Sequence, residues 1–311
     1  MRRVHAAGVA ALGLLLSGCG YAATPVAQPS PSASSSSAPS SCTAAQSQPS
    51  SYLRSYAPSH DKNTPTIHAI KQRDVLRVGV AWDTLGMGAR NVDTNGVEGF
   101  DIDLAEAIGK ALGVPVEFRV ITARDRITLL QNGTVDMVVR AFTISCDRWS
   151  QIAFSSEYYD AGQKVLVRKD AAAAYAGPQS LAGQKVCAVS GTTSLANIQK
   201  VEKKAIAVTA DTNSACLMKF QQGDADAITS DDTVLAGLVA QDKYAVVPPQ
   251  RPLEDEPYGV GMNAKATDLV AFVNGVIAEY EHDGRWQASY DKWLKPYLRV
   301  GATPPTPLYG R

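Results

Sequence analysis

The sequence predicts an α/β fold in which two lobes, each built on a mainly parallel sheet, are joined by a hinge. Predicted strands and helices alternate from about residue 66, and a helix-end motif recurs in both halves. The chain passes between the halves twice, near residues 158–164 and 253–259, and these crossings would form the hinge. Such alternation favours parallel strands with helices on both faces of the sheet. The 311 residues also suggest about two domains.

The first lobe is expected to comprise residues 66–163 and 253–311. Its clearest helix opens at Gly99, has Asp101 in the first turn and ends at Gly113. An acidic first turn suits the helix dipole, and glycine commonly ends helices. The predicted strands are 75–80, 116–120, 135–141 and 257–262. Further helices are expected over 124–131, 269–280 and 286–294, followed by a peripheral tail from residue 296.

The second lobe is expected to span residues 164–252, with a strand over 185–189 and a helix over 195–201. Residues 220–228 repeat the pattern of residues 130–138, namely a helix end, a glycine, an acidic residue and a buried strand. Because glycine stops many helices, such a match also arises by chance. If the lobes share one plan, both present strand ends to one cleft, where open α/β sheets bind ligands.

Residues 1–19 have the features of a lipoprotein signal peptide. Arg2 and Arg3 supply the positive end, and residues 9–16 form an apolar core too short to cross a bilayer. Lipid on Cys19 would then anchor the mature chain. The alternative is a plain secretory signal with an incidental cysteine. No later segment approaches about 18 continuous apolar residues, so we expect no second membrane span.

Residues 20–65 are expected to form a Ser/Pro-rich tether between the lipid and the globular body. Ser, Pro, Ala and Gln dominate up to about residue 50. Such a segment cannot bury enough apolar surface to offset its ordering entropy. Residues 51–63 are ambiguous, and a globular pattern begins near residue 66.

Four cysteines follow Cys19, and an even number in an exported protein predicts two disulfides with three alternative pairings. Cys187 and Cys216 lie in one predicted lobe and are paired, which leaves Cys42 with Cys146. Free thiols or a metal site are the alternatives. The chain has no CxxC motif and its four histidines are scattered, so we expect no metal. Its 30 basic and 30 acidic residues predict no basic surface for nucleic acid.

Polar side chains at predicted strand ends form the candidate binding site. Thr143 and Arg148 follow a strand of the first lobe, and a guanidinium there can hold a carboxylate through two hydrogen bonds. The turn 190–194 contains Thr192 and Thr193, whose hydroxyls and N–H groups suit an anion. The alternatives are a surface arginine and a helix N-cap. The turn matches neither a nucleophile elbow nor a phosphate loop.

Further charged residues follow or precede predicted elements. Asp231 and Asp232 follow a strand of the second lobe, where a carboxylate can hold an ammonium group. The alternative for either one is the N-cap of the next helix. Arg126, Arg140 and Arg90 are additional cations of the first lobe that could meet an acidic ligand. The alternative for each is a solvated surface charge.

Four motifs, in this order, resemble those of type 2 periplasmic solute-binding proteins for polar amino acids. They are GFDIDL at 99–104, TISCDR at 143–148, SGTTS at 190–194 and DAITSDD at 226–232. The resemblance covers about residues 70–295 and is closest to the glutamate/aspartate- and glutamine-binding lipoproteins of ABC importers. It implies a fold of two Rossmann-like lobes with a hinge. The loop at 82–91 also resembles its counterpart in the glutamate-binding branch.

The resemblance implies a role for each candidate residue. Arg148 and Thr143 would clamp the α-carboxylate of an amino acid with help from the Thr192 and Thr193 turn, and Asp231 would hold its ammonium group.

The arginines then bear on the choice of ligand. Arg126 matches a position that binds the distal carboxylate in glutamate/aspartate binders, which favours an acidic ligand. Arg140 stands where many relatives have small residues, so it is either a second cation for the acidic side chain or a group that narrows the pocket toward aspartate. Arg90 lies in the loop that resembles the glutamate-binding branch.

We therefore expect a monomeric, lipid-anchored protein on the extracytoplasmic face of the cell membrane. It would capture glutamate by cleft closure and deliver it to an ABC permease, without a cofactor or covalent chemistry. Aspartate, glutamine and asparagine are alternative ligands, and a sensor that signals to a membrane receptor is an alternative function. A dehydratase-like enzyme is a third hypothesis, but none of the four motifs supplies a histidine as general acid or base.

Overall fold

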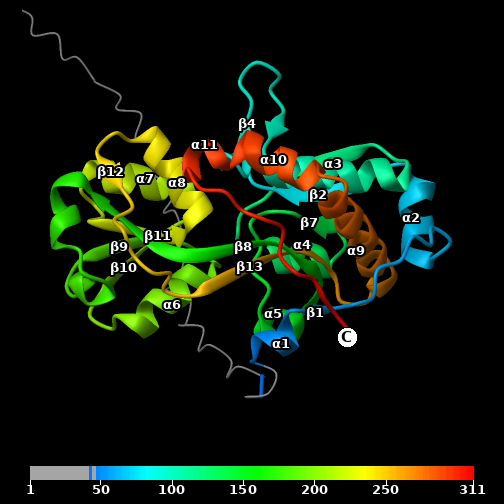
Figure 1. The fold of residues 1–311 in the computed structure, drawn as a ribbon, viewed down its shortest axis with the longest axis horizontal. Helices are drawn as coiled ribbons and strands as arrows, with labels where there is room; N and C mark the ends of the chain where they lie inside the picture. The colour runs from blue at the N-terminus through cyan, green and yellow to red at the C-terminus, as the bar shows by residue number, and fades with distance from the viewer. Residues whose placement is uncertain (1–41, 44–46) are drawn as a thin grey trace, which may run out of the picture. The chain divides into compact units, whose positions relative to one another are not determined.

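The computed structural model describes residues 42–43 and 47–311, whose fold is shown in Figure 1. The expected signal peptide, the expected lipidation site Cys19 and the first part of the expected tether lie outside the described residues. The segment Ser41–Arg311 forms one compact unit.

In the described residues, the main sheet has nine strands in the order β10-β9-β11-β8-β13-β7-β2-β6, with β12 paired to β8. Their bounds are β2 Leu76–Val80, β6 Val116–Val120, β7 Met137–Val138, β8 Ile152–Arg168, β9 Lys185–Val189, β10 Ile206–Ala210, β11 Ala227–Asp231, β12 Ala245–Val246 and β13 Asp255–Asn263. The small sheets comprise β1 Arg54–Ser55 with β14 Leu308–Tyr309, and β3 Asp83–Thr84, β4 Gly88–Arg90 and β5 Val97–Glu98.

Helices lie around both ends of the main sheet (Figure 1). They are α1 Pro49–Tyr52, α2 Pro65–Arg73, α3 Phe100–Leu112, α4 Arg126–Gln131, α5 Cys146–Trp149, α6 Thr193–Val201, α7 Asn213–Gln222, α8 Asp232–Gln241, α9 Thr267–His282, α10 Arg285–Trp293 and α11 Lys295–Leu298. The labels α6, α7 and α8 surround the β9–β11 end, whereas α2, α3 and α9 surround the β2–β7 end.

Two long strands, β8 and β13, join the two ends of the main sheet (Figure 1). β8 pairs antiparallel with β13 along its first part and with β11 along its last part, where Leu166 faces Ile228. Parallel pairs flank them: β2 with β6 and β7, and β9 with β10 and β11. The expected crossings near residues 158–164 and 253–259 therefore fall on or beside these two strands.

Apolar side chains are buried at both ends of the sheet. Leu104, Ile108 and Leu112 of α3, at the predicted four-residue spacing, are at most 2% exposed and belong to the largest buried cluster. Burying each such side chain contributes about 1.5–3 kcal/mol. A separate cluster at the other end contains Cys187 and Cys216, which form a disulfide with Cα atoms 5.7 Å apart.

The strand expected over residues 135–141 is shorter than predicted, because β7 covers only Met137–Val138. Ala141 has a φ of 40°, a left-handed backbone conformation that turns the chain away from the strand path. The carbonyl oxygens of Arg140 and Ala141 accept hydrogen bonds from Arg126 at 3.4 and 3.3 Å. The backbone after β7 therefore turns so that its carbonyl oxygens face the Arg126 side chain.

The last part of the expected tether, from residue 47 to residue 65, packs on the folded body instead of acting as a linker. Ser55 is buried and donates a hydrogen bond to the carbonyl oxygen of Phe154 at 2.8 Å. Asn274 donates to the carbonyl oxygen of Tyr56 at 2.7 Å. β1 also pairs with β14, which lies in the tail expected to be peripheral. Local composition misses this packing, because the partners are distant in sequence.

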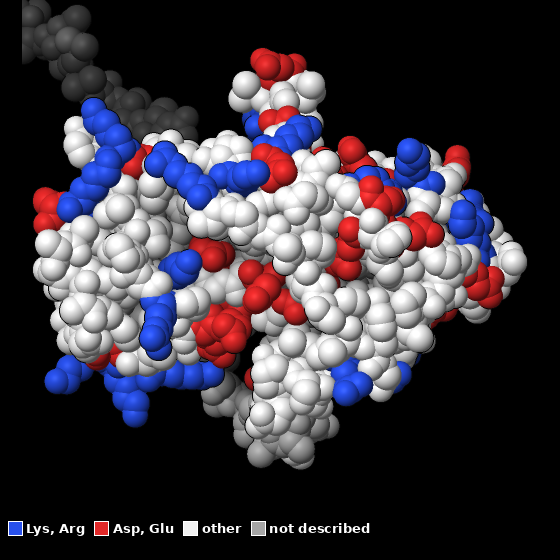
Figure 2. Space-filling model, viewed as in Figure 1, with Lys and Arg blue, Asp and Glu red and all other residues white. Residues whose placement is uncertain are grey.

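The surface carries charges of both signs. Figure 2 shows Lys and Arg interspersed with Asp and Glu on the visible face, without a continuous basic area. No helix among residues 42–43 and 47–311 combines the length and apolar character needed to cross a bilayer. In the same residues, no group of three or more His, Cys, Asp or Glu side chains is placed to hold a metal ion.

Candidate ligand-binding site

Two arginines that the sequence predicts as binding residues contact the same aromatic ring. Arg126 is the first residue of α4 and Arg148 lies in α5, and their guanidinium carbons are 4.1 and 4.9 Å from the centroid of the Phe142 ring. Both also donate to the carbonyl oxygen of Gly191, at 3.1 and 3.4 Å. Gly191 belongs to the turn before α6, so the arginines of one half of the chain reach the other half.

Backbone carbonyls hold both guanidinium groups in place. Arg126 donates to the carbonyl oxygen of Ala123 at 2.9 Å, and Arg148 donates to that of Thr143 at 2.6 Å. Burial lowers the pKa of both arginines, and for Arg126 the positive charge of Arg148 lowers the pKa further. In the described residues their hydrogen bonds go to carbonyl oxygens and not to carboxylates, so their charge is available to an anionic ligand group.

Asp231 lies at the end of β11, across from the arginines. Its Oδ2 accepts a hydrogen bond from the hydroxyl of Tyr258 at 2.6 Å, and its Oδ1 accepts one from the Ser194 hydroxyl at 3.2 Å. Burial raises the pKa of Asp231 to about 6, although these bonds and the charge of Arg126 oppose the rise. At neutral pH the group is therefore an anion placed to meet a cation.

Glu256 on β13 is a second buried carboxylate, which the sequence reasoning did not select. Its Oε2 accepts hydrogen bonds from the hydroxyls of Thr143 and Thr193, at 2.5 and 2.6 Å. Burial, followed by the negative charge of Asp231, raises its pKa to about 8. In sequence it ends an acidic run after Leu253, which is typical of a solvated loop. Only the pairing of β13 with β8 places it inside.

The structure thus brings six side chains together, which we call the arginine–carboxylate cluster: Arg126, Thr143, Arg148, Thr193, Asp231 and Glu256. Five of them were predicted. Glu256 lies on β13 itself and the other members come from segments on both sides of the β8–β13 pair. Each member carries a charge or a hydroxyl.

Three other candidates have different surroundings. Thr192 caps α6, because its hydroxyl accepts a hydrogen bond from the N–H of Leu195 at 3.3 Å. Arg140 is buried beside the cluster and donates to the carbonyl oxygen of Ile121 at 3.1 Å. Arg90 is exposed on β4, where its Nε donates to Asn95 at 3.1 Å.

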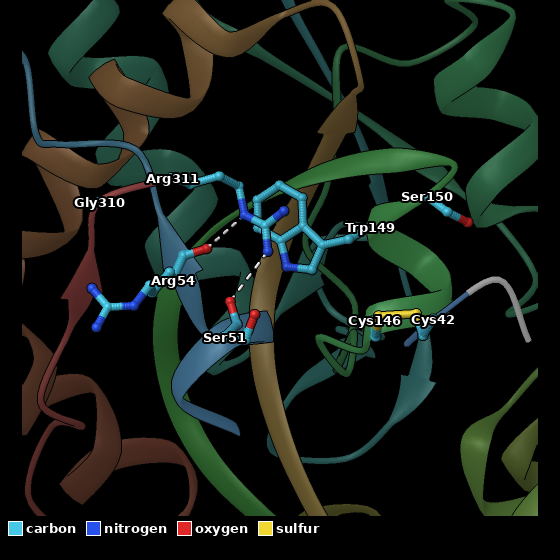
Figure 3. Close-up of a pocket in the computed structure, with 8 residues that line it drawn as sticks. All are labelled: Cys42, Ser51, Arg54, Cys146, Trp149, Ser150, Gly310 and Arg311. Atoms are coloured by element: carbon cyan, nitrogen blue, oxygen red, sulfur yellow. Dashed lines mark hydrogen bonds between the residues drawn. A yellow bond between two sulfur atoms is a disulfide. The ribbon is translucent and has the colours of Figure 1, made fainter. Parts of the chain in front are cut away.

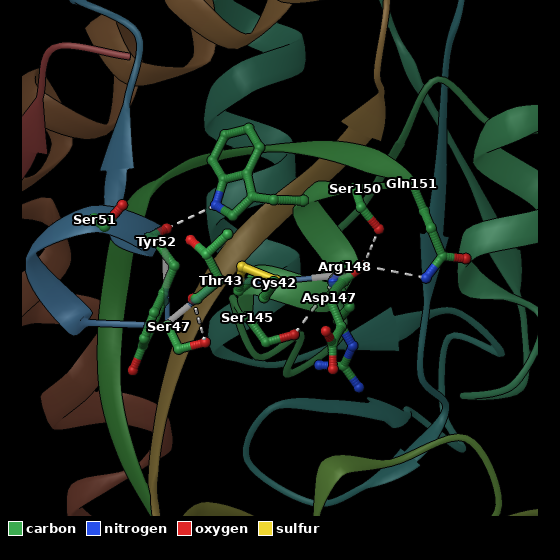
Figure 4. Close-up of a disulfide and its surroundings, with 12 residues drawn as sticks. Cys42, Thr43, Ser47, Ser51, Tyr52, Ser145, Asp147, Arg148, Ser150 and Gln151 are labelled. Carbon is green, nitrogen blue, oxygen red and sulfur yellow. Dashed lines mark hydrogen bonds between the residues drawn. A yellow bond between two sulfur atoms is a disulfide. The ribbon is translucent and has the colours of Figure 1, made fainter. Parts of the chain in front are cut away.

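The helix that carries Arg148 is anchored at several points. Cys146 begins α5 and forms a disulfide with Cys42 (Figure 4). The Cα atoms of the two cysteines are 6.0 Å apart. The Ser145 side chain caps the helix by accepting from the N–H of Arg148 at 3.4 Å. The indole of Trp149 donates to the carbonyl oxygen of Tyr52 at 2.7 Å. These contacts fix the position of the Arg148 backbone.

A cavity of about 330 Å³ lies beside this anchor (Figure 3). The Arg311 guanidinium lies 3.8 Å from the centroid of the Trp149 ring and donates to the carbonyl oxygens of Arg54 and Ser51. The lining includes none of the arginine–carboxylate cluster. These contacts join the two ends of the folded segment and do not form part of the candidate site.

Comparison with known proteins assigns the chain to a family. The family described as bacterial extracellular solute-binding proteins, family 3, matches residues 76–296. The ABC transporter glutamine-binding protein GlnH of Bacillus subtilis is 34% identical over 242 residues, covering 76% of this chain and 87% of that protein. The glutamate-binding protein GluB of Corynebacterium glutamicum is 30% identical over 224 residues, covering 68% and 76%.

Solved structures agree with this assignment. The crystal structure of a mutant of ArgBP from T. maritima matches with a TM-score of 0.70 and 30% identity, covering 74% of this chain and 99% of that one. The predicted α/β fold of the type 2 periplasmic binding proteins is confirmed, and the relatives are binding proteins of transport systems and not enzymes. The chain belongs to the bacterial extracellular solute-binding proteins, family 3.

Proposed function

We propose that this protein binds a polar amino acid, preferentially glutamate, between two lobes and delivers it to an ABC importer. The lobes would comprise residues 66–163 with 253–311, and residues 164–252. The names of the relatives support an amino-acid ligand and an importer. The observation that carries the proposal is the convergence of two arginines and two carboxylates from both sides of the β8–β13 pair.

The cluster offers a partner for each charged group of glutamate. Arg148 would hold the α-carboxylate through two parallel hydrogen bonds. Thr143 would help by turning its hydroxyl, which donates to Glu256 in this structure, toward the ligand. Asp231 would hold the α-ammonium group, and Arg126 would hold the distal carboxylate. Charge-assisted hydrogen bonds contribute about 1.5–3 kcal/mol each. Several of them support micromolar affinity, about −8 kcal/mol, after the costs of closure and desolvation. Arg140, which lies behind Arg126, would add to the positive potential near the distal carboxylate.

Contacts between the two proposed lobes support closure around the ligand. Thr143 and Thr193 meet at Glu256, and the Gly191 carbonyl meets both arginines. Gly191 has a φ of +81°, and a Cβ there would lie 2.6 Å from the Cα of Arg124 on the facing segment. A closed, loaded form differs in shape from an open, empty form, and a membrane permease can read that difference.

The anchor belongs to the same proposal. The signal-like residues 1–19 and the Ser/Pro-rich segment that follows them support a protein tethered by lipid on Cys19 at the extracytoplasmic face. Metabolic labelling with a radioactive fatty acid is expected to mark the wild type and not Cys19→Ala. Label retained in the variant would refute lipidation at this residue.

The ligand assignment is tested by calorimetric titration of the globular body with each of the twenty amino acids. We expect glutamate to bind at micromolar concentration and Arg148→Ala to remove measurable binding of every ligand. Circular dichroism would show that the variant remains folded. Retained affinity in Arg148→Ala would show that the α-carboxylate is held elsewhere. Absence of binding by every amino acid to the wild type would refute the proposed function itself.

A further inference from the structure

Glu256 has one buried oxygen that no described residue satisfies. The side chain is 0% exposed, and both threonine hydroxyls of the cluster donate to the same oxygen, Oε2. Oε1 is buried and has no hydrogen-bond partner among the described residues. Because buried polar atoms are almost always paired, an unpaired carboxylate oxygen inside a candidate binding site indicates a contact with the ligand.

Several charged or titratable groups face Glu256 from the surrounding elements. They are Arg126 of α4, Arg148 of α5, Asp231 of β11 and Tyr52 of α1. Asp255 is its neighbour on β13 but lies at the exposed surface. Arg140, buried beside the cluster, has its own negative neighbours in Asp83, Asp101 and Asp125. Within the cluster, two guanidinium groups therefore balance two carboxylates when both carboxylates are ionised.

This balance treats acidic and amide ligands differently. Glutamine is a zwitterion without net charge and does not change the charge of the site. When both protein carboxylates are ionised, glutamate adds one negative charge to a balanced buried site, and an uncompensated buried charge is strongly unfavourable. The balance is restored when one of the two protein carboxylates takes up a proton.

The hydrogen bonds identify which carboxylate accepts that proton. Both oxygens of Asp231 already accept hydroxyl donors, from Tyr258 and Ser194, and such bonds favour the ionised form. Glu256 has its unpaired Oε1, which can carry a proton and donate it to an acceptor on the ligand. A protonated Glu256 can donate to a ligand carboxylate, whereas an amide offers both a donor and an acceptor and suits either form.

We propose that Glu256 is a ligand-contacting residue that determines specificity: it must be protonated for an acidic amino acid to bind, whereas an amide ligand binds with Glu256 in either form. The inference rests on the proposed function and adds a residue and a proton to it. Burial and the charge of Asp231 support it, since they raise the pKa of Glu256 to about 8. The proton is thus present at neutral pH and is lost as the pH rises through about 8.

The test is calorimetric titration of the wild type with glutamate and with glutamine between pH 6.5 and pH 8.5, in two buffers of different ionisation enthalpy. The Kd for glutamate should rise about fourfold over this range, with uptake of roughly three-quarters of a proton at pH 8.5. The Kd for glutamine should change less than twofold. The Glu256→Gln variant, which mimics the protonated form, should bind glutamate independently of pH and without proton uptake.

Glu157 on β8 supplies a matched control, because burial also raises its pKa to about 8, and the charges that add to this shift are those of Asp160, Asp255 and Glu281 and not of the cluster. Glu157→Gln should keep the wild-type dependence on pH. Proton uptake that persists in Glu256→Gln, or an equal dependence on pH for both ligands, would overturn the assignment of the proton to Glu256. Failure of the wild type to bind either ligand at any pH would instead refute the proposed function.

Discussion

Replacing Arg126 by alanine separates two roles of one guanidinium. The group lies 4.1 Å from the centroid of the Phe142 ring and donates to the Gly191 carbonyl oxygen at 3.1 Å. The Gly191 contact joins the two proposed lobes and supports closure, whereas the ring contact lies within one lobe. Neither contact depends on which ligand is bound. A contact with a distal carboxylate exists only with an acidic ligand. The variant should therefore weaken glutamine binding by the closure contribution alone and glutamate binding by both contributions.

The difference between the two losses isolates the contact of interest. A hydrogen bond between charged groups contributes about 1.5–3 kcal/mol, so the additional loss for glutamate is roughly 10- to 150-fold in Kd. Titration calorimetry of both ligands with wild type and Arg126→Ala measures it directly. The calculation assumes that Arg148 keeps its position in the variant. Its hydrogen bond to the Thr143 carbonyl oxygen, which does not involve Arg126, supports this assumption.

Arg90→Ala is the control for a general change in electrostatics, because Arg90 is exposed on β4 and pairs with Asn95. It should change the Kd of either ligand less than twofold. Equal losses for glutamate and glutamine in Arg126→Ala would refute the reasoning, since they would assign Arg126 to closure alone.

Three further predictions concern the fold and its response to pH. The double variant Cys42→Ser/Cys146→Ser removes a disulfide whose cysteines are separated by 104 positions and should lower the free energy of unfolding by about 2–4 kcal/mol, measured by chemical denaturation. An unchanged denaturation midpoint would contradict the proposal that this disulfide anchors α5. Gly191→Ala should raise the Kd for ligand more than tenfold, because the added Cβ would meet the backbone of Arg124 on the facing segment. Gly133→Ala is the control, because Gly133 also has a positive φ but lies in open space, and its Kd should not change in this way. Equal effects of the two variants would point to backbone strain alone. The Tm of the ligand-free protein should fall as the pH rises from about 5 to 8, because burial raises the pKa of Glu157 to about 8 and favours its protonated form in the folded state. Glu157→Gln should reduce the slope of Tm against pH. An unchanged slope would exclude Glu157 as its cause.

Motifs in the sequence were sufficient to predict most of the cluster. Arg148 and Asp231 each follow a strand, and the ends of strands in such sheets meet at one place. Arg126 opens the helix that follows β6, so the same argument applies to it. The local sequence pattern predicts where these three residues lie, because the strand or helix next to each one determines its position.

Glu256 and Arg90 show where that reasoning stops. Glu256 is buried because β13 pairs with β8, where Glu256 lies opposite Ala161 at a sequence separation of 95. A local sequence pattern cannot predict a pairing between such distant residues. Arg90 belongs to a loop similar to that of glutamate-binding proteins, but the small β3-β4-β5 sheet directs it to Asn95. In both cases the pairing of strands determines where the side chain lies.

The packing of residues 47–65 was missed for a related reason. The segment is rich in Ser and Pro, a composition typical of linkers. It is nevertheless held by pairing of β1 with β14 and by the buried side chain of Ser55. Each of these contacts joins residues far apart in sequence.

A crystal structure of the protein with bound glutamate tests the central claim most directly. We predict that the α-carboxylate lies within hydrogen-bonding distance of the Arg148 guanidinium, the ammonium group at Asp231, and the ligand within reach of Glu256 Oε1. Glutamate bound at another place, with Arg148 and Asp231 still in contact only with protein atoms, would contradict the account.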